Sequence, residues 1–595
     1  MIQTEEKSRK VKQIFLLFLL VGIGFLIFLA VLLGNILSEK TLPKLYIERN
    51  SKAIRGSIIT ADGFHVAKSQ KLYKAVINTK YIDKDKMELF IALFNIYSGI
   101  PKKEIRKKLR HTNGIVVLSY NISEKVAKYL KQLSYELRRY KVFVRIKNKK
   151  TGVFVMQGLS VLESGESRIY PYKTALTPVI GYPHKSEKDG YTLSKGVKGI
   201  ERRFEDELEP RRDGKISGQR DVHGYILLNK ESLVKEPLNG LDVVLSINLG
   251  LQIRLEHMLD KAKKALKATE VFLAVMDSHT GKVLALASSN RFLPKHIRKK
   301  DYKSLNTSAI EFSFEPGSVI KPITFSILLE HKLVNPYELV NGHKGRFKIG
   351  RKTITDEHRF EWLSAEDVIV HSSNVGMAQL SQRLNGTMFY EGLKKFGFTK
   401  YSTPDLIYER RGSIPSALKL EHEIYKATTS YGYGMRVNLM QLLRAYSAFN
   451  NNGKIVHPYL VTKFLDGDEV ILSEKYEQER AIKATTAKRM QKILIKTVLK
   501  GTGTKAITPG LVVGGKTGTA HLVEHRKYVH KYNTSFLGFA NDKTHHYSIG
   551  VVVRKPTTQH FASQTAVPVF KKTIDIMIEE GYLKPTIIKE PGRPD

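Results

Sequence analysis

The sequence predicts a mixed α/β protein with one membrane-spanning helix near its N-terminus and two domains after it. Three observations support this prediction. A long uncharged apolar run lies close to the N-terminus. Strand and helical patterns follow it, and the sequence from about residue 150 to 235 is rich in loops and strands. After a linker at 237–240, apolar strands lie at both ends of a block that is helical in pattern. Strands that flank a helical block indicate one sheet assembled from distant segments of the chain.

The membrane-spanning helix is predicted from the run between Ile14 and Leu33, which contains 20 apolar or glycine residues. At about 1.5 Å per residue, this run matches the roughly 30 Å hydrocarbon core of a bilayer. No small-residue cleavage site follows it, which favours an uncleaved anchor over a signal peptide. Four basic residues precede it: Lys7, Arg9, Lys10 and Lys12. Their excess predicts a cytoplasmic tail at 1–13, an anchor at 14–37 and a remainder outside the cytoplasm.

The net charge of the chain bears on which molecules the protein binds. Lys and Arg number 98 against 57 Asp and Glu, which gives a formal net charge of +41. The basic residues are spread along the whole chain and no nucleic-acid-binding module is recognisable, so a solvated basic surface is favoured over nucleic-acid binding. Anionic lipid head groups of the inner membrane are a further candidate contact for the basic runs.

Metal and disulfide chemistry are not expected. The chain has no cysteine, which excludes disulfides and cysteine-ligated metal sites. His521, His525 and His530 lie in one polar segment, but their spacing without a helical apolar face is not that of a ligand set. No metal and no other cofactor is therefore predicted.

The first domain after the anchor, predicted at 38–236, combines strands and helices. Residues 55–69 alternate like two strands around the Asp62-Gly63 turn signal. One helical pattern starts at Lys86, and a second follows Ser123, a good N-cap. Four residues are expected on the buried face of that second helix: Val126, Tyr129, Leu130 and Leu133.

The second domain, predicted at 240–580, opens with a strand and a helix and closes with strands and a helix. Two apolar strands around Thr280-Gly281 follow the opening helix, and helical text extends from Ser318 to about residue 449. A C-terminal tail is predicted at 581–595. The opening helix has apolar residues at helical spacing: Leu251, Leu255, Leu259, Ala262 and Leu266.

The stretch FEPGSVIKPITF contains a serine and a lysine three positions apart in otherwise apolar text. Pro316 and Gly317 break the chain before Ser318, so this serine is expected to open a helix. Residues i and i+3 share a helix face, which brings the Lys321 amine beside the Ser318 hydroxyl. A desolvated lysine has a lowered pKa and acts as a base. A single match is weak, because a capping serine and a surface lysine give the same pattern.

Two further segments carry polar residues suited to holding a substrate. Ser372 and Asn374 lie in HSSNVGMAQL beside a helical apolar run, where alone they indicate only a helix cap. The strand segment GGKTGTA has glycines that let a substrate backbone lie alongside, and its polar groups can bind a carboxylate. It does not fit a Walker A loop, which would enter a helix. Its candidates are Lys516, Thr517, Gly518 and Thr519.

Together the three segments indicate a serine acyl-transfer site. They occur in the order Ser-x-x-Lys, Ser-x-Asn and Lys-Thr-Gly, with 54 residues from Ser318 to Ser372 and 144 from Ser372 to Lys516. This set combines a helix start, a loop between helices and a strand. Three chance matches in this order are far rarer than one.

On these motifs the chain resembles the class B penicillin-binding proteins, monofunctional D,D-transpeptidases of peptidoglycan synthesis. RGSIITADG and GVKGIERRFEDEL resemble parts of the family's N-terminal pedestal domain. AVMDSHTGKVLALAS, FEPGSVIKP, SSNVG, GGKTGTA and SFLGFA resemble its transpeptidase domain, in order. The resemblance covers nearly the whole chain. It implies an elongated α+β pedestal and a domain similar to serine β-lactamases, with a helix-flanked sheet and an all-α subdomain.

The resemblance also implies a role for each candidate residue. Ser318 is expected to attack the penultimate D-Ala carbonyl of a stem pentapeptide, with Lys321 as its base, and to be acylated by β-lactams. Ser372 is expected to relay a proton to the departing D-Ala and Asn374 to bind the donor peptide. The strand residues are expected to hold the terminal carboxylate, with Lys516 counted among the catalytic groups. The backbone N–H groups of Ser318 and Thr519 are expected to form the oxyanion hole. An amine of a second stem peptide then takes the acyl group.

Within the family, the short stretch between ALASSN and FEPGSVIKP and the segment GQRDVHGYIL resemble the division-type, septal members. This subtype implies a single-pass inner-membrane protein with a periplasmic catalytic domain. Its expected partners are a SEDS-family glycosyltransferase and other divisome membrane proteins. An elongation-type, side-wall enzyme and a catalytically inactive scaffold are the alternatives. The membrane anchor and the pedestal argue against a β-lactamase.

Overall fold

The computed structural model describes residues 2–37, 45–110, 113–147, 154–188, 191–219, 221, 226–473, 476–525 and 527–586. The chain forms two compact units. The first comprises Met1–Ser51 and Asp213–Pro237, and the second comprises Lys52–Arg212 and Leu238–Asp595.

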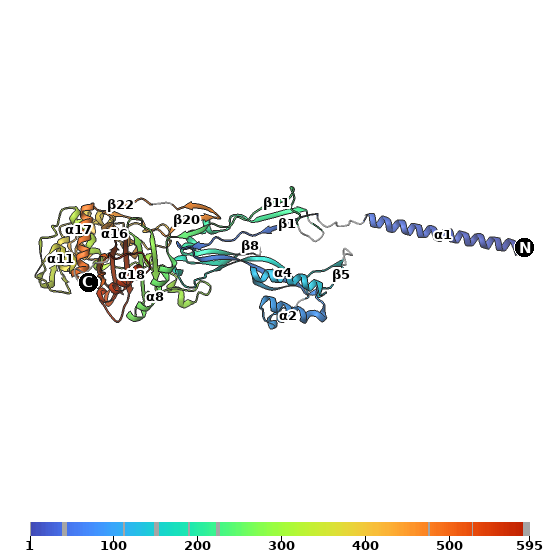
Figure 1. The fold of residues 1–595 in the computed structure, drawn as a ribbon, viewed down its shortest axis with the longest axis horizontal. Coiled ribbons are helices and arrows are strands. Elements are labelled where there is room, and N and C mark those ends of the chain that lie inside the picture. Colours follow the sequence, from blue (N-terminus) through green and yellow to red (C-terminus); the bar gives the residue numbers. More distant parts are fainter. Residues whose placement is uncertain are drawn as a thin grey trace, which may run out of the picture. The chain divides into compact units, whose positions relative to one another are not determined.

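The first unit contains the N-terminal helix and a small sheet. Helix α1 (Ile2–Leu37) begins before the predicted anchor and ends with it (Figure 1). Its stretch Lys7–Leu37 has 31 residues and a mean hydropathy of 3.2, and its most apolar part is not buried against other residues. This is the length and composition of a membrane-spanning helix. Three antiparallel strands complete the unit: β1 (Tyr46–Ser51), β10 (Gly214–Gln219) and β11 (Leu233–Lys235).

A nine-stranded sheet in the second unit has the order β21-β20-β12-β2-β3-β7-β9-β8, with β4 also paired to β3. Strands β2 and β3 form the predicted hairpin around Asp62-Gly63. Strands β12, β20 and β21 follow the predicted linker in the sequence, so the sheet joins both halves of the chain. The bounds are β2 (Ile58–Ile59), β3 (His65–Asn78), β4 (Ile115–Ser123), β7 (Ser160–Ile169), β8 (Tyr182–Lys188), β9 (Tyr191–Lys198), β12 (Asp242–Leu245), β20 (Val461–Asp466) and β21 (Glu469–Leu472).

Three helices pack together beside β3 and β4: α2 (Met87–Ser98), α3 (Lys102–Leu109) and α4 (Glu124–Arg139). Both predicted helices are confirmed, and Ser123 caps α4 by accepting a hydrogen bond from the Val126 N–H at 3.5 Å. The prediction of a buried Tyr129 is wrong, because this side chain is 46% exposed. The buried stripe of α4 instead contains Ala127, Leu130, Leu133, Ser134 and Leu137.

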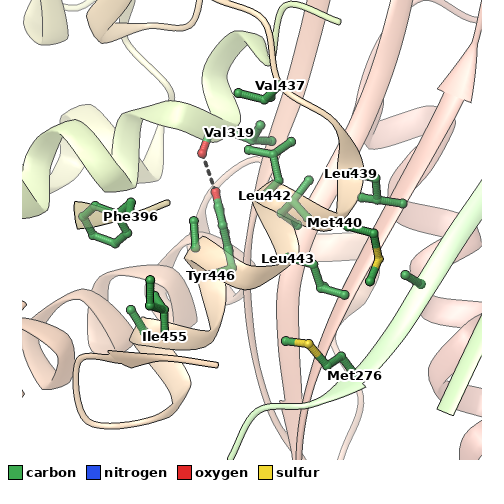
Figure 2. Packing of buried hydrophobic residues seen from close by; sticks show 14 of the residues in the cluster. Met276, Val319, Phe396, Val437, Leu439, Met440, Leu442, Leu443, Tyr446 and Ile455 are labelled. Atoms are coloured by element: carbon green, nitrogen blue, oxygen red, sulfur yellow. Dashed lines mark hydrogen bonds between the residues drawn. The ribbon is translucent and has the colours of Figure 1, made fainter. Parts of the chain in front are cut away.

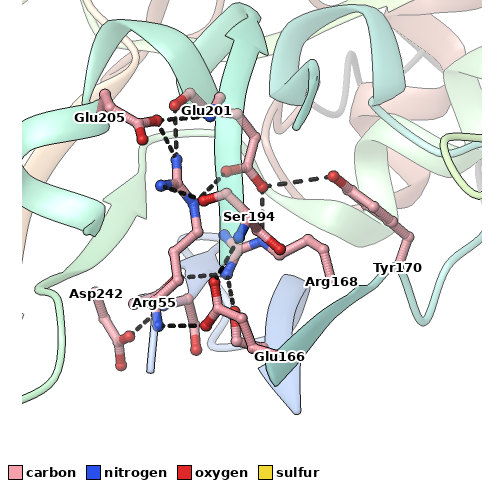
Figure 3. A network of polar contacts seen from close by, with 12 residues as sticks. Arg55, Glu166, Arg168, Tyr170, Ser194, Glu201, Glu205 and Asp242 are labelled. Carbon is pink, nitrogen blue, oxygen red and sulfur yellow. Dashed lines mark hydrogen bonds and ion pairs between the residues drawn. The ribbon is translucent and has the colours of Figure 1, made fainter. Parts of the chain in front are cut away.

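A buried ionic network ties the segment before β2, strand β7 and the short helices α6 (Gly199–Arg203) and α7 (Glu205–Leu208) together (Figure 3). Arg55 donates from Nε to Glu201 Oε2 and from Nη2 to Glu205 Oε2, each at 2.9 Å. Arg168 donates from Nε to Glu201 Oε1 at 2.7 Å. The two guanidinium groups lower the pKa of the Glu201 carboxyl, although burial alone would raise it. The charges of Arg55 and Glu201 are therefore compensated inside the protein.

A five-stranded antiparallel sheet forms the centre of the second half, in the order β14-β13-β25-β24-β23. Helices α8 (Leu249–Leu266) and α18 (Ala566–Glu579) cover one face, and α16 (Leu439–Asn450) packs on the other. The predicted sheet built from distant segments is confirmed. Its strands are β13 (Glu270–Asp277), β14 (Val283–Ser288), β23 (Val512–Glu524), β24 (Lys527–Asn541) and β25 (His546–Arg554).

A helical block lies between β14 and β23 in the sequence. Its helices are α9 (Ser308–Glu311), α10 (Lys321–Glu330), α11 (Ala365–Val370), α12 (Asn374–Ser381), α13 (Gly386–Lys395), α14 (Ala417–Glu421), α15 (Glu423–Ser430), α16 and α17 (Ala484–Lys500). The block includes the predicted helical stretch from Ser318 to about residue 449, but α9 lies before that stretch and α17 lies after it. The remaining short elements are α5 (Thr177–Ile180), α6 (Gly199–Arg203), α7 (Glu205–Leu208), β5 (Ile146–Lys147), β6 (Phe154–Val155), β15 (Leu339–Asn341), β16 (Arg346–Ile349), β17 (Lys352–Thr355), β18 (Trp362–Ser364), β19 (Lys454–Ile455) and β22 (Glu479–Arg480).

Helix α16 connects the central sheet to the segment that carries Ser318. Its apolar side chains pack against Met276 on β13, and the hydroxyl of Tyr446 donates a hydrogen bond to the Val319 carbonyl at 2.6 Å (Figure 2). Tyr446 is 1% exposed, so this bond lies inside the core. This buried hydrogen bond from Tyr446 thus helps to fix the position of the segment that follows Gly317.

Candidate active site

Ser318 lies in a single 3₁₀ turn, Gly317–Ile320, which leads directly into α10 at Lys321. The α-helix therefore begins three residues after the serine and not at it. Residues i and i+3 are eclipsed in a 3₁₀ turn, so Ser318 and Lys321 lie on the same side of the segment. Gly317 has a φ of 59°, and its N–H donates to the Gly432 carbonyl at 3.2 Å.

Lys321 is completely buried and its amine contacts the second predicted motif. The Nζ atom donates to the Ser372 carbonyl at 2.5 Å and to Asn374 Oδ1 at 2.7 Å, and it lies 3.3 Å from Ser372 Oγ. In the described part of the chain, no direct hydrogen bond joins Nζ to Ser318. Ser372 has a φ of 63°, a left-handed conformation that a serine adopts only under local constraint.

Burial sets the protonation of this amine. Desolvation lowers the pKa of Lys321 from 10.5 to about 7, while the charges of Asp356 and Glu357 act in the opposite direction. A lysine with such a pKa is about half in its neutral, proton-accepting form at neutral pH. This is the state that the apolar setting around Ser318 was expected to produce.

Asp356, which the motifs did not identify, holds the Ser-x-Asn segment in place. Its Oδ1 accepts hydrogen bonds from the N–H groups of Asn374 at 2.5 Å and Val375 at 3.0 Å. Its Oδ2 accepts a hydrogen bond from Ser373 Oγ at 2.5 Å. A carboxylate at the N-terminus of α12 satisfies unpaired backbone donors and favours the helix dipole. The aspartate thus fixes Asn374 relative to Lys321.

The third motif lies on the edge strand β23. Lys516 is completely buried, and its Nζ lies 3.2 Å from the Thr517 carbonyl and 3.3 Å from Thr517 Oγ1. Desolvation, together with the nearby charge of Lys321, lowers the pKa of Lys516 well below its ordinary value. Thr517 Oγ1 also pairs with Thr502 Oγ1 at 2.7 Å.

Gly518 brings β23 and the serine turn together. A Cβ at this position would lie 2.5 Å from Ser535 Oγ, 2.9 Å from Val319 Cγ1 and 3.0 Å from the Pro316 carbonyl oxygen. Only glycine therefore permits this close approach. The role of Gly518 visible in the structure is packing, although it was predicted as a substrate-binding residue.

The three motifs meet at one pocket of about 420 Å³. Of the predicted residues, Ser318, Ser372, Asn374, Thr517 and Thr519 line it. Lys321, Lys516 and Gly518 are buried and are not among the lining residues. Aromatic and histidine side chains complete the wall: His358, Phe360, His371, Tyr433, His521, Tyr532, His560 and Phe561.

Two further residues support the pocket without a signal in the sequence motifs. Tyr446 anchors the serine turn through Val319, as described above. Glu315 Oε1 accepts hydrogen bonds from the Gly434 N–H at 2.8 Å and from the Tyr528 hydroxyl at 3.2 Å. The hydrogen-bond partners of Tyr446 and Glu315 are more than 100 residues away in the sequence, so the neighbouring sequence does not predict these contacts.

Among the described residues, no group of three or more His, Asp or Glu side chains is arranged to hold a metal ion. His521 and His530 have ring centroids 6.2 Å apart, and His521 packs against Tyr532 at 4.6 Å. His521 belongs to the aromatic wall of the pocket. The arrangement offers a hydroxyl, a buried amine with a lowered pKa and carboxylate-binding groups, which are the parts of a serine acyl-transfer site.

Family models match most of the chain. The penicillin binding protein transpeptidase domain matches residues 271–575, and the penicillin-binding protein dimerisation domain matches residues 50–245. The chain belongs to the class B penicillin-binding proteins. The part of this penicillin-binding protein that matches the transpeptidase model contains all three motifs and the pocket.

Similar curated proteins are peptidoglycan enzymes by name. A probable peptidoglycan D,D-transpeptidase PenA of Neisseria flavescens is 30% identical over 396 residues, 66% of this chain and 96% of the relative. A peptidoglycan D,D-transpeptidase FtsI homolog of Mesostigma viride is 24% identical over 596 residues, 95% of this chain and 94% of the relative. The similarity therefore extends over both halves of the chain.

Solved structures share the fold. Penicillin binding protein 2X of Streptococcus thermophilus has a TM-score of 0.72 at 21% identity, covering 91% of this chain and 82% of its own. Penicillin binding protein 3 of Mycobacterium tuberculosis, in complex with aztreonam, has a TM-score of 0.64 at 22% identity. The match covers 90% of this chain and 98% of the chain of that protein. The mixed α/β penicillin-binding fold predicted from the sequence is thus confirmed. The division-type segment GQRDVHGYIL lies partly outside the described residues, at Arg220 and 222–225.

Proposed function

We propose that this penicillin-binding protein cross-links peptidoglycan as a D,D-transpeptidase through an acyl-enzyme on Ser318. The observation that carries the proposal is that Ser318 and the Lys-Thr-Gly strand line one pocket, and that the buried Lys321 amine, with a pKa lowered to about 7, donates to Asn374 in the pocket wall. The names of the curated relatives support the same activity.

The first step transfers the donor peptide to the enzyme. Lys321 Nζ takes the proton of Ser318, and Oγ attacks the penultimate D-Ala carbonyl carbon of a stem pentapeptide. The peptide C–N bond breaks, and the D-Ala nitrogen receives a proton from Lys321 through Ser372 Oγ, which lies 3.3 Å from Nζ. The backbone N–H groups of Ser318 and Thr519 stabilise the oxyanion. Asn374 hydrogen-bonds the donor backbone.

The carboxylate of the departing D-Ala binds on β23. Thr517 and Thr519 line the pocket there, with Lys516 directly beneath. An approaching carboxylate raises the pKa of Lys516, because an opposite charge favours the protonated amine. A substrate without that carboxylate leaves the pKa of Lys516 lowered by burial. The buried lysine thus contributes to selection of peptides that end in a free carboxylate.

Helix α1 is proposed as a single-pass anchor of the inner membrane, with the N-terminus in the cytoplasm and the catalytic domain in the periplasm. The four basic residues before the apolar stretch support this orientation. The FtsI name among the relatives favours septal synthesis over the side wall. A SEDS-family glycosyltransferase and other divisome membrane proteins are the proposed partners, on the family resemblance.

The activity is tested with the full chain in detergent and a stem pentapeptide substrate. The wild-type protein is expected to release D-Ala and form a cross-linked dimer, and Ser318→Ala is expected to do neither. Release by the Ser318→Ala variant would refute the proposed mechanism.

Depletion of the protein in cells, followed by microscopy, tests the subtype. Filamentous cells would support the septal role, and round cells would support the side-wall role.

A further inference from the structure

The described lining of the pocket contains two carboxylates and no lysine or arginine side chain. Asp356 uses both oxygens to hold α12, through Asn374, Val375 and Ser373. The neighbouring Glu357 is exposed. Among the described residues, its carboxylate has no hydrogen bond and no ion pair. In the pocket, the Asp356 carboxylate is thus used to hold α12, whereas the Glu357 carboxylate has no hydrogen-bond or ion-pair partner among the described residues.

The charge of Glu357 acts on the reaction centre. It raises the pKa of both Lys321 and Lys516 against the opposing effect of burial, so its field reaches both amines. The carboxylate also lines the same pocket as Ser318. A negative group with this access attracts a cation that enters the pocket from solvent.

Transpeptidation brings such a cation to the pocket. The acceptor is an amine of a second stem peptide and is mainly an ammonium group in neutral water. The bound ammonium gives one proton to water, and the resulting amine attacks the acyl carbon. The ester C–Oγ bond then breaks, and the second amine proton passes to Ser318 Oγ. The donor site on β23 is built for a carboxylate, so the ammonium needs a separate group of opposite charge.

We infer that Glu357 is the group that captures the ammonium of the acceptor peptide beside the acylated Ser318. The inference rests on the proposed transpeptidase function. Glu357 acts in the second half of the reaction, since the first half involves only the donor peptide. Its removal is therefore expected to raise the KM for the acceptor, while the rate of acylation at neutral pH changes by at most about twofold through the loss of the Glu357 charge near Lys321.

The test uses the full chain in detergent, a depsipeptide donor and two small acceptors. Glycinamide carries an ammonium group, whereas hydroxylamine is an uncharged nucleophile at neutral pH. The matched control is Glu361→Gln, since Glu361 is exposed on the same loop, pairs with Lys344 at 3.5 Å and does not line the pocket. Penicillin acylation of each variant measures the first half-reaction separately.

Glu357→Gln is expected to raise the KM for glycinamide about threefold, and Glu357→Lys about tenfold, as for an exposed charge pair. The KM for hydroxylamine, the penicillin acylation rate and the kcat of transfer are expected to stay within about twofold of the wild type. Added salt should raise the glycinamide KM of the wild type more than that of Glu357→Gln.

An unchanged KM for glycinamide in both variants would overturn the inference, as would an equal rise for the two acceptors. Either result leaves the transpeptidase function standing if the wild type still transfers the acyl group. A wild-type protein that forms no acyl-enzyme would instead refute the proposed function.

Discussion

At the scale of single residues, the site depends on one buried amine. Lys321 is surrounded by protein, and its hydrogen bonds go to the Ser372 carbonyl and Asn374 Oδ1. Desolvation brings its pKa to about 7, so the lysine changes protonation state close to neutral pH. A lowered pKa is what a base requires here, because a charged lysine cannot accept the proton of Ser318.

This assignment predicts the pH dependence of acylation. The rate of Ser318 acylation by penicillin should be low below pH 7, where Lys321 is protonated, and should rise to a plateau as pH increases through about 7. Stopped-flow measurement of acyl-enzyme formation against pH tests this. A rate that is flat from pH 6 to 9, or that falls across this range, would contradict the role of Lys321 as the base.

The residues that could be predicted from the sequence share one property. Ser318, Lys321, Ser372, Asn374 and Lys516 lie in short motifs whose order and spacing are visible in the text. Asp356 and Glu357 could not be found in this way, because their roles arise only where their loop folds against α12 and the pocket. Residues within short sequence motifs were thus predictable, whereas residues whose roles depend on tertiary contacts were not.

At the scale of elements, the serine turn is held from two sides. Strand β23 approaches it closely at Gly518, and α16 supports it through Tyr446. The helices and strands themselves follow from periodicity, which is why most of α2, α4 and α8 agree with the sequence pattern. The packing of α16 beneath the turn could not be inferred, since apolar helices of this kind fit many partners.

The Tyr446 hydroxyl is predicted to position the serine turn. In Tyr446→Phe the Val319 carbonyl loses its buried donor, which should cost about 1–3 kcal/mol of unfolding free energy. Acylation by penicillin should slow about tenfold, because the turn is less well placed. Thermal melting and acylation kinetics measure both effects. Tyr129→Phe, at an exposed tyrosine, is the control, and equal behaviour of the two variants would disprove the role.

At the scale of the whole molecule, the second unit is stabilised by a continuous sheet and by the buried ionic network. Strands β12, β20 and β21 add to the sheet of the preceding residues, so the predicted pedestal and transpeptidase domains are not separated by a simple linker. The network around Glu201 connects elements that are distant in sequence. Long-range pairing of this kind leaves no local pattern, and the sequence predicted neither feature.

Glu201→Gln is predicted to destabilise the protein by about 3–5 kcal/mol, because it leaves two buried guanidinium groups without their shared carboxylate. The pKa of Glu201 is lowered from its ordinary 4.5, so its stabilising effect is present above pH 4.5 and is lost as pH falls through the lower native value. The difference in melting temperature between wild type and variant should therefore shrink on acidification below pH 4.5.

Glu88→Gln removes an exposed ion pair with Arg106 and is the matched control for that experiment. Its melting temperature should stay near that of the wild type. A Glu201→Gln variant as stable as this control would show that the network does not hold the unit together.

The central claim is that Ser318 is the residue that forms the acyl-enzyme. Fluorescent penicillin labelling of the full chain, followed by peptide mapping, tests it most directly. The account predicts a single labelled peptide modified at Ser318 in the wild type and no labelling of Ser318→Ala. Labelling that persists in Ser318→Ala, or that maps to another residue, would contradict it.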